Sequence, residues 1–424
     1  MSRHPYVPGG AGTPNRRPSR RSVLTALTAS AASTTLLPTT TAHATTAAER
    51  PPDALLYVGT WGQSEVHAIR FDPERGAMTP IGKVADVSSN WVATHPYHPV
   101  LYVAGSEQGG VIRTFRIDGT TGALEQLAET WTEEVPTGSG GLSYLAPTPD
   151  ATTLLVADFA AGSAVTLPIG TDGRLGAVAS RVQDAGSGPN PRQTGPHPHH
   201  VVLDPSQRYA LIADFGADRV FIHDYHRSAR GMTGMVNSYA TPPGSGPRRL
   251  AFHPHGRRTL YLLNELTADL HVLHWNTDGV GGPTLVHQQT IATDAPAHTG
   301  TTSAAELAIS HDGRHLYTSN RGDNTLVVHA IDPTTHLLTE VQRIPCGGTT
   351  PWGFCLDPTG RWIFVANMAS NTVNLIQVDA RSGRLTDTGV AAPVPQPDCV
   401  STATRPVSSG GDPPSGGERA SSRS

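Results

Sequence analysis

The sequence predicts an all-β fold, a seven-bladed β-propeller in which a C-terminal strand completes the first blade and closes the ring. The main observation is a six-residue segment that occurs seven times, each time as a short apolar run ending in small or polar residues. The seven segments are residues 56–61, 101–106, 154–159, 210–215, 260–265, 316–321 and 363–368. Their starts lie 45, 53, 56, 50, 56 and 47 residues apart, and such a period of β-rich runs is typical of a propeller with one blade per repeat.

The residues around each segment predict strands and not helices. The apolar runs alternate or are continuous, and Gly, Pro, Asp and Asn interrupt them, whereas a helical solenoid would show apolar residues at 3.6-residue spacing. A first strand and a turn precede a segment, as in 200–203 before Asp204-Pro205, and a third strand and a turn follow it, as in 325–331 before 332–335. A fourth, outer strand then completes each blade.

The first repeat lacks its first strand, because residues 55–58 are already the second strand. Residues 398–401 follow the seventh repeat, at the point where another first strand is due. We therefore expect them to pair with 55–58, which closes the ring and covers an exposed sheet edge. One propeller domain then spans residues 54–403, and the Ser-, Gly-, Pro- and Arg-rich residues 404–424 are expected to form a disordered tail.

The N-terminus has the pattern of an export signal. Residues 19–24 contain a twin-arginine motif, residues 25–37 are mildly apolar, and residues 42–44 (Ala-His-Ala) form a small-x-small cleavage site. The pattern predicts a signal peptide at 1–44, a linker at 45–53, and a protein that is secreted or extracytoplasmic by the twin-arginine pathway. A disordered basic tail is the alternative. The apolar stretch is too short and too rich in Thr for a retained membrane span.

Charge and composition limit the partners. Residues 1–44 hold five of the 31 basic residues and no acidic ones, so the mature chain has 26 basic and 35 acidic residues, a formal net charge of −9. That balance disfavours nucleic acid and anionic membranes as partners. A closed ring has no open sheet edge, so we expect a monomer. Cys346, Cys355 and Cys399 show no metal-ligand spacing, and both buried free thiols and one disulfide remain open.

Several short motifs stand in register along the repeats. They are Pro196-His197-Pro198-His199, Asp204-Pro205, Gly246-Pro247-Arg248-Arg249, Asn264-Glu265-Leu266, Ala304-Ala305-Glu306, Ser319-Asn320-Arg321-Gly322 and Asp357-Pro358-Thr359-Gly360. Their order resembles the seven-bladed lactonase family, which includes the propeller type of 6-phosphogluconolactonase and the fungal carboxymuconate lactonizing enzymes. The resemblance covers about residues 54–403. It implies a small-molecule lactone or carboxylate as substrate, and it says less about which one, because one scaffold serves different ligands.

Propeller topology brings the chemistry-bearing residues of these motifs to one mouth of the central channel. The first and second strands of a blade are antiparallel, so the start of one and the end of the other lie on the same face of the ring. First strands begin at or just after His197, His199, Arg248 and Glu306, and second strands end at Glu265 and Arg321. We expect these side chains to surround a concave pocket for a small anionic or polar ligand.

The resemblance to the fungal lactonizing enzymes implies a catalytic group of one His, two Arg and one Glu, which by motif are His199, Arg248, Arg321 and Glu265. In a lactonase, Glu265 or His199 could be the general base that activates water. The two arginines offer forked donors to a carboxylate or phosphate and to a developing oxyanion. A muconate-type cycloisomerase could use the same groups, and a non-catalytic propeller that binds a small ligand or a protein also stays open.

Further residues are expected to extend the pocket as substrate-binding groups. They are His197, Arg192, Gln193, Glu306, Asn264, Asn320 and Trp352. Arg192 and Gln193 resemble an Arg-Gln element of the family, and Trp352 stands where relatives commonly carry Arg, which makes the rim less cationic. Trp61 and Trp91 occupy corresponding strand ends and could line the mouth or pack in the core.

Structural roles remain open for some of these residues. His197 and His199 could bond the backbone of their loops, and Arg321 could bridge Glu306 or Asp323. A zinc site is not expected, because catalytic zinc needs three convergent ligands and no acidic residue stands at diagnostic spacing from the histidines. The sequence thus predicts a secreted hydrolase that opens a sugar-type lactone, similar to 6-phosphogluconolactonase, without a metal or other cofactor.

Overall fold

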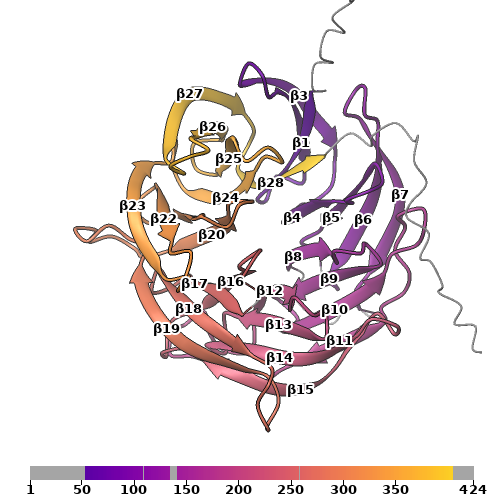
Figure 1. Cartoon of the computed structure of the whole chain (residues 1–424). Helices are drawn as coiled ribbons and strands as arrows, with labels where there is room; N and C mark the ends of the chain where they lie inside the picture. Colours follow the sequence, from indigo (N-terminus) through magenta and orange to yellow (C-terminus); the bar gives the residue numbers. More distant parts are fainter. Residues whose placement is uncertain (1–52, 108, 134–140, 257, 404–424) are drawn as a thin grey trace, which may run out of the picture. The chain divides into compact units, whose positions relative to one another are not determined.

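A computed structural model describes residues 53–107, 109–133, 141–256 and 258–403. The predicted signal peptide (1–44), the linker except for its last residue, and the predicted tail (404–424) lie outside these residues. Seven four-stranded antiparallel sheets follow one another around a central axis in the described residues, and the colours of Figure 1 pass once around the ring from indigo to yellow. The prediction of an all-β, seven-bladed propeller is confirmed.

Each blade is ordered from the channel outward. The strands next to the channel are β28 (Pro397–Ala403), β4 (Trp91–Thr94), β8 (Leu142–Pro147), β12 (Pro198–Leu203), β16 (Pro247–Phe252), β20 (Ala304–Ile309) and β24 (Pro351–Leu356). The second strands are β1 (Ala54–Thr60), β5 (Val100–Ala104), β9 (Thr153–Asp158), β13 (Tyr209–Asp214), β17 (Thr259–Asn264), β21 (His315–Asn320) and β25 (Trp362–Asn367).

The remaining strands form the outer half of each blade. The third strands are β2 (Val66–Asp72), β6 (Val111–Ile117), β10 (Ser163–Pro168), β14 (Arg219–His226), β18 (Asp269–Asn276), β22 (Thr325–Ile331) and β26 (Thr372–Val378). The rim strands are β3 (Ala77–Ala85), β7 (Leu124–Trp131), β11 (Ser180–Gln183), β15 (Gly231–Ala240), β19 (Thr284–Ala292), β23 (Leu338–Pro345) and β27 (Leu385–Pro393).

The recurring six-residue segments are the second strands, and their burial explains their composition. Every residue of β9, β13, β17, β21 and β25 is buried, because both faces of the strand meet a neighbouring blade. The apolar side chains form seven clusters, each shared by two adjacent sheets; Leu56 of β1, for example, packs in one cluster with Phe364 of β25. A strand covered on both faces has a continuous apolar sequence instead of an alternating one.

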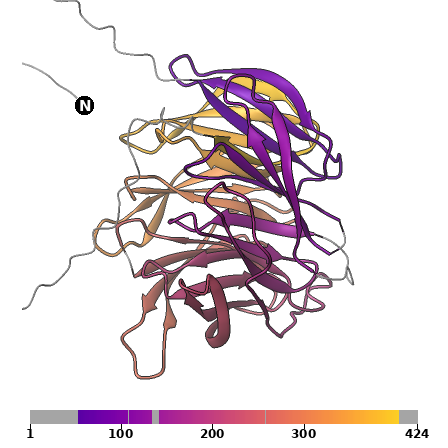
Figure 2. The same cartoon turned by 90° about the vertical axis from the view of Figure 1, so that its right-hand side faces the viewer.

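The ring closes as the sequence predicts. β28 pairs with β1 in antiparallel register, with Leu55 opposite Ala403 and Gly59 opposite Cys399. Figure 2 shows the last strands of the chain, in yellow, beside the first ones, in indigo. The first blade is therefore built from both ends of the propeller, and its sheet has no uncovered inner edge.

The described residues contain neither a disulfide nor a helix that could cross a membrane. Cys346 and Cys399 are buried free thiols, and Cys355 is a half-buried one. Of the two cysteine states that the sequence leaves open, the structure therefore has the free thiols.

The closing strand carries a buried acid, Asp398, whose protonation should set the stability of the ring closure. The oxygens of its carboxyl group make no hydrogen bond of good geometry and only weak contacts with Cys399, and burial raises its pKa to about 7. An unfolded aspartate releases its proton near pH 4, so the folded state holds the proton between about pH 4 and 7. The stability that this proton provides is complete below pH 4 and is lost as the pH rises through 7.

Replacing Asp398 with Asn should therefore raise the free energy of unfolding at pH 8 by about 2 kcal/mol. At this pH the wild type loses about 1.4 kcal/mol for each unit by which its folded pKa exceeds the unfolded one. The cost of burying the new amide without partners offsets part of this gain in the variant. Urea unfolding of both proteins at pH 5 and pH 8 measures this; the advantage of the variant should be absent at pH 5. As a control, Asp278→Asn changes an exposed acid and should leave the pH dependence as it is. Equal pH dependence of Asp398→Asn and the wild type would contradict the prediction.

Candidate functional site

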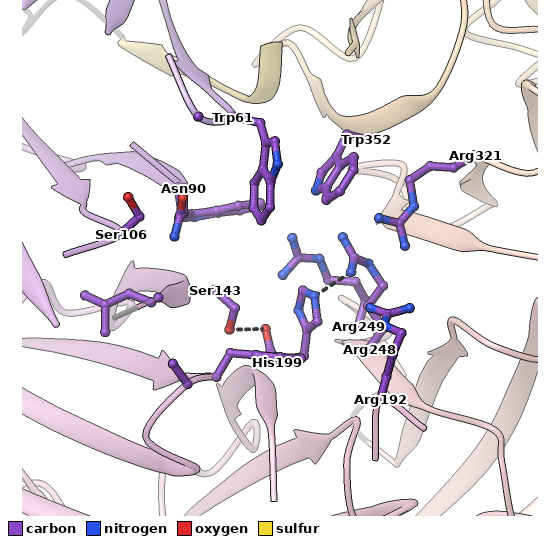
Figure 3. A pocket seen from close by; sticks show the side chains of 16 residues that line it. Trp61, Asn90, Ser106, Ser143, Arg192, His199, Arg248, Arg249, Arg321 and Trp352 are labelled. Carbon is purple, nitrogen blue, oxygen red and sulfur yellow. Dashed lines mark hydrogen bonds between the residues drawn. The ribbon is translucent and has the colours of Figure 1, made fainter. Parts of the chain in front are cut away.

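A cavity of about 500 Å³ opens at one mouth of the channel, and its walls differ in chemistry (Figure 3). Four arginines form one wall: Arg192, Arg248, Arg249 and Arg321. Aromatic rings form another: Trp61, Trp91, Phe159 and Trp352. The neutral polar residues are Asn90, Ser106, Ser143 and His199, and no carboxylate of the described residues lines the cavity.

A β-bulge near the start of the inner strand places much of this lining. Register shifts interrupt the pairing of six inner strands with their second strands in the described residues: β8, β12, β16, β20, β24 and β28. The residues at these shifts include Ser143, His199, Arg248 and Trp352, all of which line the cavity. A bulge adds one residue to a strand and re-aims its side chain, so strands of several blades present side chains to the same space.

The second source of site residues is the position directly after a second strand. Trp61, Phe159, Glu265 and Arg321 follow β1, β9, β17 and β21. The backbone amides of Trp61, Glu265 and Arg321 bond to the loops that lead into the inner strands: Trp61 N to Gln396 O at 2.8 Å, Glu265 N to Gly246 O at 2.8 Å and Arg321 N to Ser303 O at 2.7 Å. The end of each second strand thus lies beside the start of its inner strand, as the antiparallel topology predicts.

Glu265 binds three of the four arginines. Its Oε1 lies 2.7 Å from Arg192 Nη1 and 2.9 Å from Arg321 Nη2, and its Oε2 lies 2.6 Å from Arg248 Nη1. The carboxylate is fully buried behind the guanidinium groups and does not line the cavity. The Glu265–Arg321 contact brings together residues from blades five and six, as expected from sequence. Among the described residues, Arg321 forms no ion pair with Glu306 or Asp323, the alternative partners that the sequence left open.

The electrostatics of Glu265 make it an anchor for the arginines and a weak base. Burial alone would raise its pKa, but Arg321, Arg248 and Arg192 hold the pKa down to about 2. In turn, burial and the neighbouring Arg321 lower the pKa of Arg248 to about 9. A base works best when its pKa is near the working pH. Of the two bases that the sequence suggests, His199 lines the cavity and Glu265 does not, so the position of His199 favours it as the base.

His199 is a neutral imidazole at the edge of the arginine wall. Its Nε2 accepts a hydrogen bond of 2.5 Å from Arg248 Nη1, so we assign its proton to Nδ1, which has no partner (Figure 3). Burial, Arg248 and Arg249 hold its pKa well below the usual value of 6.5. The ring also meets the edge of Phe159, with centroids 5.8 Å apart. Near neutral pH this imidazole is free of charge and able to accept a proton.

Arg249 is a site residue that the sequence interpretation missed, although it stands next to Arg248 in a quoted motif. In regular β alternation, only one of two adjacent residues faces the channel, but the bulge in β16 lets both do so. Arg249 lies over the rings of Trp91 and Tyr144, at 4.3 and 5.3 Å, and its Nε is 2.9 Å from Glu306. Glu306 itself faces a second cavity of about 320 Å³ farther along the inner strands, so it supports Arg249 from behind.

Other predicted binding residues have structural roles. The Gln193 amide donates to Phe215 O and Asp218, Asn264 donates to Asp269 at 2.7 Å, and the Asn320 amide donates to the Thr293 carbonyl group. None of the three lines the cavity. Their polar side chains fasten the turns next to the strand ends, which is the other common reason for a polar residue at these positions.

His197 also lies behind the cavity wall, whereas the tryptophans form part of it. The ring of His197 stacks on Phe159 at 4.5 Å and bonds the Phe159 carbonyl oxygen at 2.8 Å, so it is one of the loop histidines considered from sequence. Trp61, Trp91 and Trp352 all line the cavity, and Trp352 was expected to do so.

The described residues contain no cluster of three or more His, Cys, Asp or Glu side chains in an arrangement for a metal ion. The positive charge of the site comes from the four guanidinium groups. Glu265 and Glu306 balance two of these four charges, and the cavity wall therefore has an excess of positive charge that suits an anionic ligand.

Comparison with known proteins points to one family. The model of the family described as lactonase, 7-bladed β-propeller, matches residues 55–402. The 6-phosphogluconolactonase of Bacillus subtilis is 26% identical over 349 residues, which cover 81% of this chain and 97% of that protein. The 6-phosphogluconolactonase of Serratia proteamaculans is 26% identical over 333 residues, covering 78% and 93%.

Comparison with solved structures points to the same family. The periplasmic gluconolactonase of Pseudomonas aeruginosa has 29% identity and a TM-score of 0.74, and the match covers 83% of this chain and 99% of that one. A structure described as a putative 6-phosphogluconolactonase from Bacteroides fragilis has 26% identity and a TM-score of 0.72, covering 83% and 98%.

Proposed function

Since the chain belongs to the lactonase family of seven-bladed β-propellers, we propose that it hydrolyses an anionic, sugar-type lactone in the cavity at the channel mouth. One observation carries this proposal: a neutral imidazole, His199, adjoins the guanidinium group of Arg248 in a cavity whose described lining includes no carboxylate. Lactone opening needs a base for water and positive charge for the oxyanion, and this pair offers both.

Binding uses the arginine wall. Arg248 and Arg249 are almost fully buried and the side chain of Arg321 is 8% exposed, so a substrate anion meets them where little water competes. Glu265 keeps Arg192, Arg248 and Arg321 in place before the substrate arrives, and such preorganisation avoids a reorganisation cost during the reaction. Ser143 and Asn90 face the same space and offer uncharged contacts to hydroxyl groups.

The reaction has two steps. In the first step, His199 Nε2 exchanges its hydrogen bond with Arg248 Nη1 for one with a water molecule, while Arg248 stays bound to Glu265. His199 Nε2 then takes a proton from this water, whose oxygen attacks the acyl carbon. The oxyanion that forms is stabilised by the guanidinium groups of Arg248 and Arg321. The bond between the acyl carbon and the ring oxygen then breaks, the ring oxygen receives the proton from His199, and the product is a hydroxy acid that releases one proton on ionising.

The substrate is proposed to be met outside the cytoplasm. Two features support this: the twin-arginine pattern of residues 19–24 and the likeness to a gluconolactonase described as periplasmic. Several relatives are named 6-phosphogluconolactonase, so the phosphorylated and the unphosphorylated lactone are the two substrates to compare. The export itself can be checked by fusing residues 1–53 to a reporter in a strain with or without the twin-arginine translocase.

Purified mature protein should open 6-phosphogluconolactone, the anionic one of the two lactones, faster than the spontaneous reaction, and pH-stat titration would record one acid equivalent per turnover. Turnover of the uncharged gluconolactone alone would contradict the requirement for an anion. The proposal includes a metal-independent reaction, so the rate should be the same after dialysis against EDTA. Muconolactone belongs in the same panel, because its ultraviolet absorbance reports ring closure or opening.

The panel separates the alternatives. Turnover of muconolactone alone, without hydrolysis of either sugar lactone, would replace the proposal with a cycloisomerase. No turnover of any lactone, by a folded protein that still binds gluconate or phosphate, would identify a non-catalytic binding propeller. Loss of the rate with EDTA and its return with a divalent metal would contradict the metal-independent mechanism.

A further inference from the structure

Three residues from different blades form a stack at one side of the cavity mouth. The guanidinium carbon of Arg321 lies 4.4 Å from the ring centroid of Trp352, and the rings of Trp352 and Trp61 are stacked with centroids 5.1 Å apart and planes 30° apart. Figure 3 shows Trp352 between Arg321 and Trp61. Arg321 is in turn bound to the buried Glu265, so the stack has a fixed inner end.

The outer end of the stack is open. Both faces of the Trp352 ring are in contact, one with Arg321 and the other with Trp61. Trp61, in contrast, is 44% exposed and is one of the few large apolar residues that are exposed to solvent. Its backbone is not free to move away, because Trp61 N donates to Gln396 O at 2.8 Å next to the closing strand. An immobilised Trp with an exposed ring surface in a binding cavity is suited to stacking on a ligand.

We propose that Trp61 is a specificity-determining residue whose exposed face packs against the ring of the substrate while the arginine wall holds the substrate's anionic group. The inference rests on the proposed function for the identity of the site and adds the class of ligand: an anion attached to a ring with an apolar face. Two kinds of ring have such a face, the C–H face of a sugar ring and an aromatic ring.

Binding of three phosphates tests this without any turnover. Glucose 6-phosphate and phenyl phosphate share one anion and differ in the ring, and inorganic phosphate has no ring. In Trp61→Ala, calorimetric titration should show binding of at least one ring-bearing phosphate weakened about tenfold, with inorganic phosphate unchanged. Trp61→Phe keeps an aromatic face and should restore most of the affinity. Trp131→Ala is the matched control, since Trp131 is 40% exposed on β7 and does not line the cavity.

The pattern of affinity losses in Trp61→Ala identifies the kind of ring that Trp61 contacts. Loss for glucose 6-phosphate alone assigns a sugar ring, and loss for phenyl phosphate alone assigns an aromatic one. Equal affinities of the wild type and Trp61→Ala for both ring-bearing phosphates would overturn the inference, as would an equal loss for inorganic phosphate. Because these probes are not lactones, the result is independent of the lactone panel: a protein that opens no lactone can still show the ring preference.

For a lactone that is turned over, Trp61→Ala should raise KM and leave kcat within about twofold.

Discussion

Replacing Glu265 with Gln is expected to lower the free energy of unfolding by about 3 kcal/mol and to reduce kcat/KM at least a hundredfold. The carboxylate is fully buried and compensates Arg192, Arg248 and Arg321, so a neutral amide leaves three guanidinium groups close together without their counter-charge. Urea unfolding and steady-state kinetics with the best lactone of the panel measure the two effects.

The pH dependence of this stability difference follows from the pKa of Glu265. The folded pKa of about 2 lies below that of an unfolded glutamate, about 4.3. The stabilisation is therefore complete above about pH 5 and is lost as the pH falls toward 2. Consequently, the wild type and Glu265→Gln should become more alike in stability below about pH 4.

A surface pair is the control for this substitution. Glu125 binds Arg116 at 2.6 Å, but the two side chains are 65% and 55% exposed, so Glu125→Gln should leave the stability unchanged within the error of the measurement. If Glu265→Gln were as stable as the wild type and lost only kcat, Glu265 would act on the substrate directly instead of anchoring the arginines.

Replacing His199 with Asn should lower kcat by a factor of about 10² to 10⁴, the usual contribution of a general base. The active form is the neutral imidazole, and burial with Arg248 and Arg249 holds its pKa well below 6.5. The wild-type rate should thus stay constant as the pH falls from neutral through 6.5, the usual pKa of histidine, and decrease only well below it, as the imidazole becomes protonated. A pH profile of kcat measures this acid limb, which should disappear in His199→Asn.

The exposed His226 at the end of β14 provides the control, and His226→Asn should keep both the rate and the profile. An acid limb that persists unchanged in His199→Asn would assign the base to another group. Little change in kcat together with a raised KM would make His199 a binding residue only.

The propeller could be predicted because its repeats depend on local sequence. A second strand lies between two neighbouring sheets, so it must be apolar on both faces, and seven such strands appear in the sequence as seven apolar runs. The closing strand was predictable for a related reason: a repeat without an inner strand leaves a sheet edge that only the other end of the chain can cover. The convergence of Glu265 with Arg321 followed from the antiparallel order of strands alone.

The bulges could not be predicted, and they decide which side chains enter the cavity. A bulge changes the register by one residue without leaving a mark in the alternation of apolar and polar residues. Arg248 and Arg249 are therefore equivalent in sequence, yet one binds Glu265 with two other arginines and the other binds Glu306 and lies over two aromatic rings. Likewise, nothing local separates Asn264 and Asn320, which fasten turns, from the neighbouring residues of the site.

The repeat pattern alone was enough to infer the architecture, the closure and the mouth at which the polar residues meet, since each of these depends on strand order and on burial that recurs in every blade. The function of each residue at that mouth depends on contacts between blades that are far apart in the chain. Glu265 is an acid at a strand end in the sequence, and only the folded ring surrounds it with three guanidinium groups that lower its pKa. This lowered pKa is one reason why His199 is proposed as the base. Charges interact through space, and the distances between them exist only once the ring has closed.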